Sequence, residues 1–298
     1  MEHMMKTSKS YIKDTIVSYL FMSPSMIIFI WFMVIPIFMS FYISLNDWNI
    51  LSGVKWNAGR NYINILSDKV FIKSLINTLY FSALTVIPTA VLSLLVALLI
   101  NSKLIKYKEF FKGVLFIPVV ASMVIASLVW KWIFHGDVGL LNYFIGLFGI
   151  KPVLWLSTIQ YAMLAVSIMS VWKSVGYYMV LYLAGLTGIP DSLYEAAKVD
   201  GGTKWDIFIK ITIPMLKPTI LLVLVMATIN SFQVFDAIYV MTYGGPANAT
   251  NTLVWFIYQQ GFVRYQMGYG ATAGFFLFLI VFIVSVFELK LLKSDTMY

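Results

Sequence analysis

Six long uncharged stretches divide the chain, and each is long enough to cross a membrane as a helix. A helix needs roughly 20 apolar residues to span a hydrocarbon core about 30 Å thick, because each residue adds about 1.5 Å. The pattern therefore predicts an all-α integral membrane protein with about six transmembrane helices. The stretches lie between Asp14 and Asp47, Lys73 and Lys103, Lys112 and Lys131, Lys151 and Lys173, Lys217 and Asp236, and Arg264 and Glu288.

Lysine and arginine are unevenly shared between the segments that connect these stretches. Short cytoplasmic segments are enriched in them, so the richer side is expected to face the cytoplasm. We expect a cytoplasmic N-terminus over residues 1–15, a transmembrane domain over 16–288 and a cytoplasmic tail over 289–298. The richer side holds thirteen of these residues: Lys6, Lys9, Lys13, Lys103, Lys106, Lys108, Lys112, Lys198, Lys204, Lys210, Lys217, Lys290 and Lys293. The poorer side holds seven: Lys55, Arg60, Lys69, Lys73, Lys131, Lys151 and Arg264.

Composition agrees with lipid as the solvent and argues against several function classes. Hydrophobic residues make up 60% of the chain and charged residues only 11%. The net charge of +8 comes from short lysine clusters between apolar stretches, so nucleic acid is not expected as a partner. With no cysteine and only His3 and His135, neither a metal centre nor a thiol nucleophile is expected. The sequence has no GxxxxGK[ST] phosphate-binding loop, so ATP hydrolysis by this chain is not expected.

The segment over residues 189–218 is polar enough to leave the membrane and has the pattern of two short helices. Ser192 and Glu195 have the spacing of a capping box, which predicts a helix start. Gly201 and Gly202 predict the end of that helix in a left-handed C-cap. A first surface helix is therefore expected between these two signals.

A second helix is predicted directly after the glycines. Thr203 and Asp206 offer its start, and Pro214 is expected to end it. Ala196 and Ala197 are small, which favours close approach of another protein to the first helix. An amphipathic helix resting on lipid headgroups explains the same pattern, so the residues alone leave both interpretations open.

One string in this segment resembles a known motif. Glu195-Ala196-Ala197, three residues, Gly201, nine residues and Ile211-Thr212-Ile213-Pro214 resemble the EAA loop of binding-protein-dependent ABC importer permeases. Ile213 stands where leucine is usual. Residues 185–190, 231–236 and 244–246 extend the likeness to the carbohydrate branch, which includes the lactose, multiple-sugar and glycerol-phosphate permeases. The resemblance covers nearly the whole chain from residue 15 onward, and it implies the type I ABC importer permease fold with a cytoplasmic coupling helix over 190–214.

The resemblance also implies roles for this loop and a set of partners. The coupling helix would sit in a groove of a cytoplasmic ATPase subunit, with Glu195 against a basic group, Gly201 as the elbow and Asp200 bracing the turn. For Glu195 and Gly201 the alternative is a plain role in capping the helix. For Asp200 the alternative is a solvated carboxylate. The implied partners are a second homologous permease, two ATPase subunits that bind ATP and Mg²⁺, and an extracytoplasmic solute-binding protein. The implied ATPase-coupling residues are Glu195, Ala196, Ala197, Asp200, Gly201 and Pro214.

Polar residues inside the stretches are candidates for a solute path, because they are costly in lipid and tend to face a cavity or another helix. Lys173, Ser174 and Tyr177 are one group; snorkelling of Lys173 to the headgroups is the alternative. The fifth stretch supplies amides, a hydroxyl and a carboxylate beside aromatic rings, which suits a sugar; hydrogen bonding between helices is the alternative. These residues are Asn230, Ser231, Gln233 and Asp236.

The expected function is thus a non-catalytic permease subunit, without a cofactor of its own, in a bacterial-type cell membrane. It would carry a sugar or related polyol by alternating access. A stand-alone ion-coupled transporter is the alternative; it would show acidic residues near mid-membrane, whereas Asp236 lies at the end of a stretch. The sequence does not name the solute.

Overall fold

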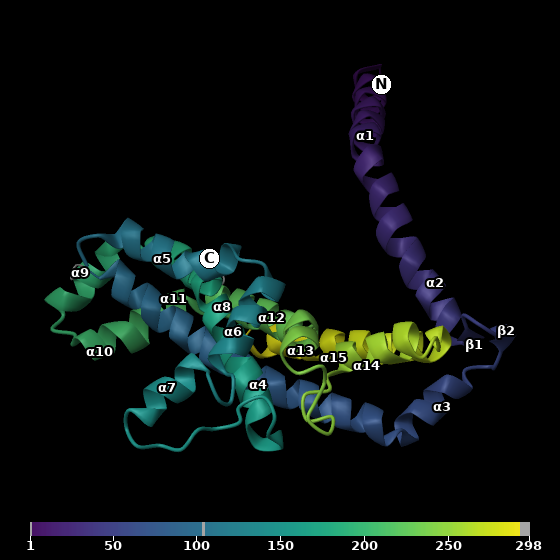
Figure 1. Ribbon diagram of the computed structural model, residues 1–298. Coiled ribbons are helices and arrows are strands. Elements are labelled where there is room, and N and C mark those ends of the chain that lie inside the picture. Colours follow the sequence, from purple (N-terminus) through teal and green to yellow (C-terminus); the bar gives the residue numbers. More distant parts are fainter. Residues whose placement is uncertain (1, 103–104, 293–298) are drawn as a thin grey trace.

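The computed structural model describes residues 2–102 and 105–292, and most of them are helical (Figure 1). Within this described part, four helices are long and apolar enough to cross a membrane, or up to six if each of two bent helix pairs is one span. The predicted all-α membrane fold is confirmed. Lys103, Lys293 and the rest of the predicted tail from residue 293 onward lie outside the described residues.

The first span is nearly separate from the rest of the molecule. It consists of α1 (Glu2–Phe29), a π-helical turn η1 (Ile30–Val34) and α2 (Ile35–Ser44). Proline lacks an N–H and clashes with the preceding turn, so the wider π-helical turn directly before Pro36 accommodates it. The most apolar window of this span has no buried residue, and Figure 1 shows the helix projecting away from the body.

A short hairpin and a helix connect the first span to the body. Strands β1 (Asn46–Asn49) and β2 (Gly53–Trp56) pair antiparallel, with Asn46 opposite Trp56, and α3 (Arg60–Ser67) follows. The side-chain amide of Asn61 donates to the carbonyls of Ser44 (3.1 Å) and Asn46 (2.9 Å), which fixes the hairpin against α3. This small sheet is an addition to the predicted all-helical pattern.

The body is built around four long helices, α4 (Lys69–Asn101), α8 (Ile159–Thr187), α12 (Lys217–Phe232) and α15 (Met267–Leu292). Buried apolar residues such as Ala97, Tyr182 and Val223 join α4, α8 and α12 in one core. The hydroxyls of Ser82 and Ser231 lie 2.6 Å apart across α4 and α12. These four helices hold the positions of the remaining short ones.

Two of the predicted spans differ in form from the simple pattern. The fourth continues past Lys173 and runs over Ile159–Thr187, because Lys173 finds partners inside the body and does not have to leave the helix. The third is broken: α5 (Lys108–Val120) and α6 (Met123–Ile133) meet at 96°. A short α7 (Leu140–Gly146) follows α6.

The remaining short helices form two groups along the chain. Helices α9 (Asp191–Val199), α10 (Lys204–Ile207), η2 (Phe208–Thr212) and α11 (Ile213–Met215) lead into α12, while α13 (Asp236–Met241), α14 (Leu253–Tyr258) and η3 (Gln259–Val263) lead into α15. Figure 1 shows α9 and α10 at the end of the body opposite to the β hairpin. The loop over 190–214 is thus separated from the hairpin by the length of the long helices.

Candidate functional site: a bent surface helix pair and a polar cavity

Helix α9 begins one residue before the predicted capping box. Pro190 occupies the N-cap position in extended conformation, and no side chain caps the helix. The capping-box role of Ser192 and Glu195 is therefore wrong, because Pro190 starts the helix early and places Ser192 inside the first turn. Glu195 is exposed, and among the described residues it has no ion pair, so its carboxylate points to solvent.

The end of α9 is a Schellman turn centred on Gly201. Gly201 has a φ of +78°, the Gly202 N–H donates to the Ala197 carbonyl at 2.8 Å, and the Gly201 N–H donates to the Lys198 carbonyl at 3.1 Å. The predicted left-handed C-cap is confirmed. It turns the chain sharply, so that α10 starts three residues after Gly201, at Lys204.

Helix α10 begins with the predicted capping box, which is confirmed. The Thr203 N–H donates to the Asp206 carboxylate at 3.2 Å, and the Asp206 N–H donates to the Thr203 hydroxyl at 3.1 Å. Lys210 donates to the same carboxylate at 2.7 Å. The bonds from Lys210 and Thr203 lower the pKa of Asp206 to about 2.

The sequence predicted that the second surface helix ends at Pro214, and this prediction is wrong. Pro214 lies inside α11, and the 64° bend falls at Leu216, between Met215 and Lys217. The π-helical turn η2 directly before α11 widens the backbone and accommodates the proline. Pro214 therefore belongs to a different helix from the other predicted coupling residues.

Those other residues share one exposed surface on α9 and its turn. Glu195, Ala196, Asp200 and Gly201 are exposed, and Ala197 is partly buried. Two apolar side chains on the same loop are open to solvent: Val199 is 87% exposed and Trp205 is 70% exposed. Exposed apolar side chains on such a loop are available to a protein partner or to a membrane surface.

A polar cavity of about 180 Å³ lies between α4, α8 and α12. Five of the seven residues predicted for a solute path line it, and they come from α8, from α12 and the turn that follows it, and from the start of α13. These are Ser174, Asn230, Ser231, Gln233 and Asp236. The other lining residues are Phe81, Thr85, Val86, Thr89, Met123, Ser170, Tyr178, Ala227, Val234 and Phe235.

The cavity combines open polar groups with aromatic rings. The Asn230 amide donates to the Tyr178 hydroxyl at 3.1 Å. Asn230, Gln233 and Asp236 keep exposed side chains, whereas Ser231 is held by the α4 hydroxyl described above. Phe235 stacks on Trp255 with ring centroids 6.1 Å apart. Amide, carboxylate and ring faces therefore meet in one place.

Comparison with known proteins identifies the family. Residues 70–292 match the family described as the binding-protein-dependent transport system inner membrane component. The chain belongs to this family. The match contains both the helix pair and the cavity, so this permease is a membrane component of a binding-protein-dependent ABC transport system.

Relatives and solved structures agree over nearly the whole length. The permease is similar to the arabinooligosaccharides transport system permease protein AraP of Bacillus subtilis, with 34% identity over 93% of this chain and 88% of the relative. It is 35% identical to the lactose transport system permease protein LacF of Rhizobium radiobacter, over 96% of this chain and 97% of the relative. A chain of a bacterial ABC transporter involved in the import of the acidic polysaccharide alginate has the same fold, with a TM-score of 0.84, 23% identity, and 97% and 99% of the two chains covered.

Two residues of the predicted solute path lie elsewhere in the permease. Lys173 reaches neither the cavity nor a surface at the end of the helix; its ammonium donates to the carbonyls of Pro118, Val119 and Ala121. Tyr177 points to the outer surface and is 37% exposed. The cavity instead lies against Ser170, Ser174 and Tyr178, which are four residues apart and therefore share one side of α8.

The sequence analysis did not predict that residues of α4, or Tyr178 of α8, line the cavity. Tyr178 lies four residues after Ser174, so helical spacing from Ser174 would have found it. On α4, hydroxyl side chains recur every three or four residues inside an apolar helix, which indicates a polar stripe facing other helices. These residues are Ser74, Thr78, Ser82, Thr85, Thr89 and Ser93, and all are buried.

Proposed function

We propose that this permease carries a sugar or related polyol through the cavity between α4, α8 and α12, by alternating access driven by partner ATPase subunits. One observation carries the proposal: the cavity presents the amides of Asn230 and Gln233, the carboxylate of Asp236 and the ring of Phe235 together. Sugars offer many hydroxyls to amides and carboxylates, and apolar ring faces to aromatic side chains. The names of AraP and LacF, which refer to arabino-oligosaccharides and lactose, support the same solute class.

The energy for transport would come from two ATPase subunits, which bind ATP and Mg²⁺, docked on the surface of α9 and its turn. Glu195, with its carboxylate in solvent, is available to a basic group, and Val199 and Trp205 offer apolar area to a groove. The sharp turn at Gly201 connects this surface through α10 and α11 to α12, which lines the cavity. Movement at the docking surface can thus reach the cavity through a continuous helical path. Pro214 lies on this path rather than on the docking surface.

A second permease is the proposed partner for the first span and the open side of the cavity. The span over Lys13–Ser44 has no buried residue in its most apolar window, so a large apolar surface is left for a neighbouring subunit or for lipid. An external binding protein would deliver the solute from the side opposite to α9. In this orientation both termini and the loop over 190–214 are cytoplasmic, as the distribution of lysine and arginine favours.

The experiment is uptake into proteoliposomes that contain this permease with its co-purified partners, using a panel of di- and oligosaccharides. We expect saturable uptake that needs ATP. Asn230→Ala should raise the half-saturating sugar concentration by about tenfold, because one hydrogen bond to the sugar is lost. Lys112→Met, which alters an exposed α5 ion pair with Glu109, is the matched control and should leave uptake unchanged.

Uptake that follows an ion gradient and ignores ATP would instead favour the ion-coupled transporter. Uptake that needs ATP but excludes every sugar in the panel would remove the solute class while leaving the family assignment intact. Co-purification of an ATPase with the wild type, and its loss in Glu195→Lys, tests the docking surface separately from the solute.

A further inference from the structure

The break between α5 and α6 leaves backbone groups without helical partners in the middle of the body. Helix α5 ends at Val120, α6 begins at Met123, and the two axes differ by 96°. The last carbonyls of a helix have no intrahelical donor, and in a membrane no bulk water is at hand to replace it. A stable break at this place therefore needs a donor from another element.

Lys173 on α8 supplies that donor. Its ammonium lies 2.7 Å from the Ala121 carbonyl, 3.1 Å from the Pro118 carbonyl and 3.4 Å from the Val119 carbonyl. An ammonium has three N–H groups, so three carbonyls satisfy it completely. Positive charge is also favoured at the C-terminal end of a helix, where the helix dipole is negative.

The same face of α8 holds the body of α5. Gly176 lies one turn after Lys173, and a Cβ placed there would clash with the Leu115 carbonyl oxygen. The α5 backbone therefore lies directly on α8 at Gly176, and its end is bound by Lys173. Contact and charge together fix where α5 stops.

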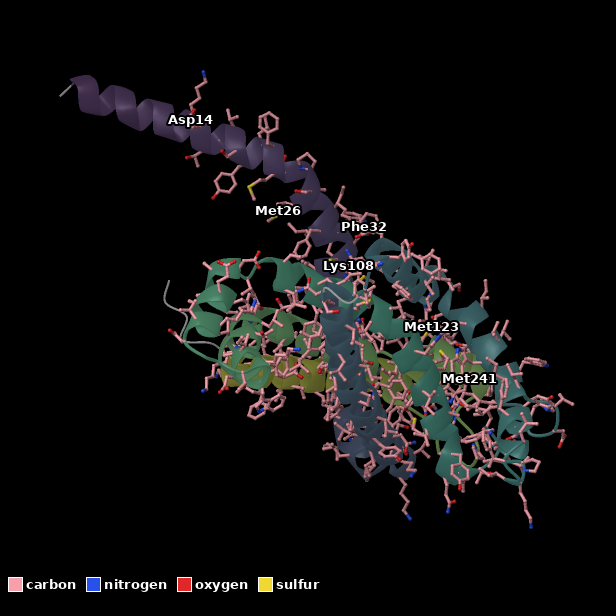
Figure 2. All side chains as sticks on the ribbon, turned by 90° about the vertical axis from the view of Figure 1, so that its left-hand side faces the viewer. Asp14, Met26, Phe32, Lys108, Met123 and Met241 are labelled. Carbon is pink, nitrogen blue, oxygen red and sulfur yellow. The ribbon has the colours of Figure 1, made fainter. Side chains whose placement is uncertain are left out.

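The consequence reaches the cavity. Met123, the first residue of α6, lines the cavity together with Ser174, the residue next to Lys173. Met123 also packs against the cluster that contains Met241 of α13, and Figure 2 labels both residues in the region where α6 and α13 pack. The position of this wall depends on where α5 ends and α6 begins.

We infer that Lys173 is a positioning residue: its charge holds the α5–α6 break and so keeps the start of α6 in the cavity wall. A charge inside a span is expensive, and among the described side chains no carboxylate lies within ion-pair distance of this lysine. Within the described part of the chain, three backbone carbonyls are its only hydrogen-bond acceptors. The importance of this wall for the solute rests on the proposed function. The contacts between Lys173 and the α5–α6 break do not depend on that function.

Cysteine labelling tests the geometry without a solute, because the chain has no cysteine of its own. Met123→Cys is made in the full chain, co-expressed with its partners and held in nanodiscs. The labelling rate with a charged, water-soluble thiol reagent is then compared for Lys173, Lys173→Met and Lys173→Arg. Ser174→Cys, on α8 in the same cavity, is the matched control site, and Lys112→Met is the control for loss of a lysine on α5.

In Lys173→Met, labelling at position 123 is expected to fall by about tenfold, which is about 1.4 kcal/mol, as α6 leaves the polar cavity. Labelling at position 174 should stay within about twofold, and Lys173→Arg should restore most of the rate at position 123, because it keeps the charge. An unchanged rate at position 123 overturns the inference. An equal fall at both positions also overturns it, since that would mean general loss of structure. Because no sugar or ATP is present, these outcomes are independent of whether sugar uptake is observed.

Discussion

Replacing Gly201 by alanine tests whether the turn after α9 is held by backbone conformation. Gly201 has a φ of +78°, and a Cβ added there would meet no heavy atom within 4 Å. Alanine therefore introduces no clash, and its cost is confined to the left-handed backbone. That cost is roughly 1–2 kcal/mol for an L-amino acid other than glycine.

A strain of this size lowers the equilibrium constant for forming the native turn by a factor of about 5 to 30. The docking surface on α9 is then presented to an ATPase subunit less often, so the apparent affinity falls by up to the same factor. Asparagine adopts the left-handed region several-fold more readily than most other residues. Gly201→Asn should therefore bind better than Gly201→Ala, although asparagine is the larger side chain.

The assay is titration of the purified ATPase subunit against the permease in nanodiscs, for glycine, asparagine, alanine and valine at position 201. We expect affinity to decrease in that order. Gly113→Ala on α5 is the control: Gly113 has no left-handed φ and open space around its Cβ position, so affinity should not change.

Two results would refute the reasoning. Equal binding by Gly201→Ala and wild type would show that the left-handed turn is not needed for docking. Weaker binding by asparagine than by alanine would show that side-chain volume in the interface, and not backbone strain, sets the effect.

Tyr178→Phe removes the hydroxyl that accepts the hydrogen bond from the Asn230 amide, which is worth about 1 kcal/mol. The half-saturating sugar concentration in uptake should therefore rise by about fivefold. An unchanged value would mean that this bond does not order the cavity. Val199→Asp should weaken ATPase binding in the titration above, because Val199 is 87% exposed on α9. Leu51 is 80% exposed on the hairpin, so Leu51→Asp should leave binding unchanged. Equal effects of the two substitutions would contradict the docking surface. The folded-state pKa of Asp206 lies at about 2, below its ordinary value of 3.8, so its capping stabilises the fold above pH 4 and is lost as the pH falls through about 2. The thermal midpoint of wild type should thus exceed that of Asp206→Asn near neutral pH and converge with it between pH 4 and pH 2; a constant difference would show that the charge is not involved.

Patterns local in sequence predicted much of this molecule. The spans follow from uncharged length alone, and the turn at Gly201 and the cap at Thr203 follow from residues a few positions apart. The cap at Ser192 failed because Pro190, two residues earlier, started the helix first. The free-energy difference between two alternative helix starts, such as Pro190 and Ser192, is small. The first residue of a helix is therefore predicted less well than the presence of the helix.

Contacts distant in sequence were the part that local patterns missed. The hairpin pairs residues on either side of a short turn, but Asn61 from the next helix fixes it. Tyr178 was missed because the sequence did not say which ridge of α8 faces α12. Lys173 was placed in a solute path or at the headgroups, since its three acceptors lie more than fifty residues away.

By itself, the sequence determined the solvent, the helical membrane fold and the surface helix pair. A chain in lipid must satisfy its backbone within each helix, and the apolar pattern that this requires can be read residue by residue. Only the tertiary structure decided which polar side chains share the cavity and which one holds the break between α5 and α6. Those choices depend on how helices far apart in the chain rotate and pack against one another. Helical spacing can extend a face that is already known, as from Ser174 to Tyr178, but it does not say which other helix that face meets.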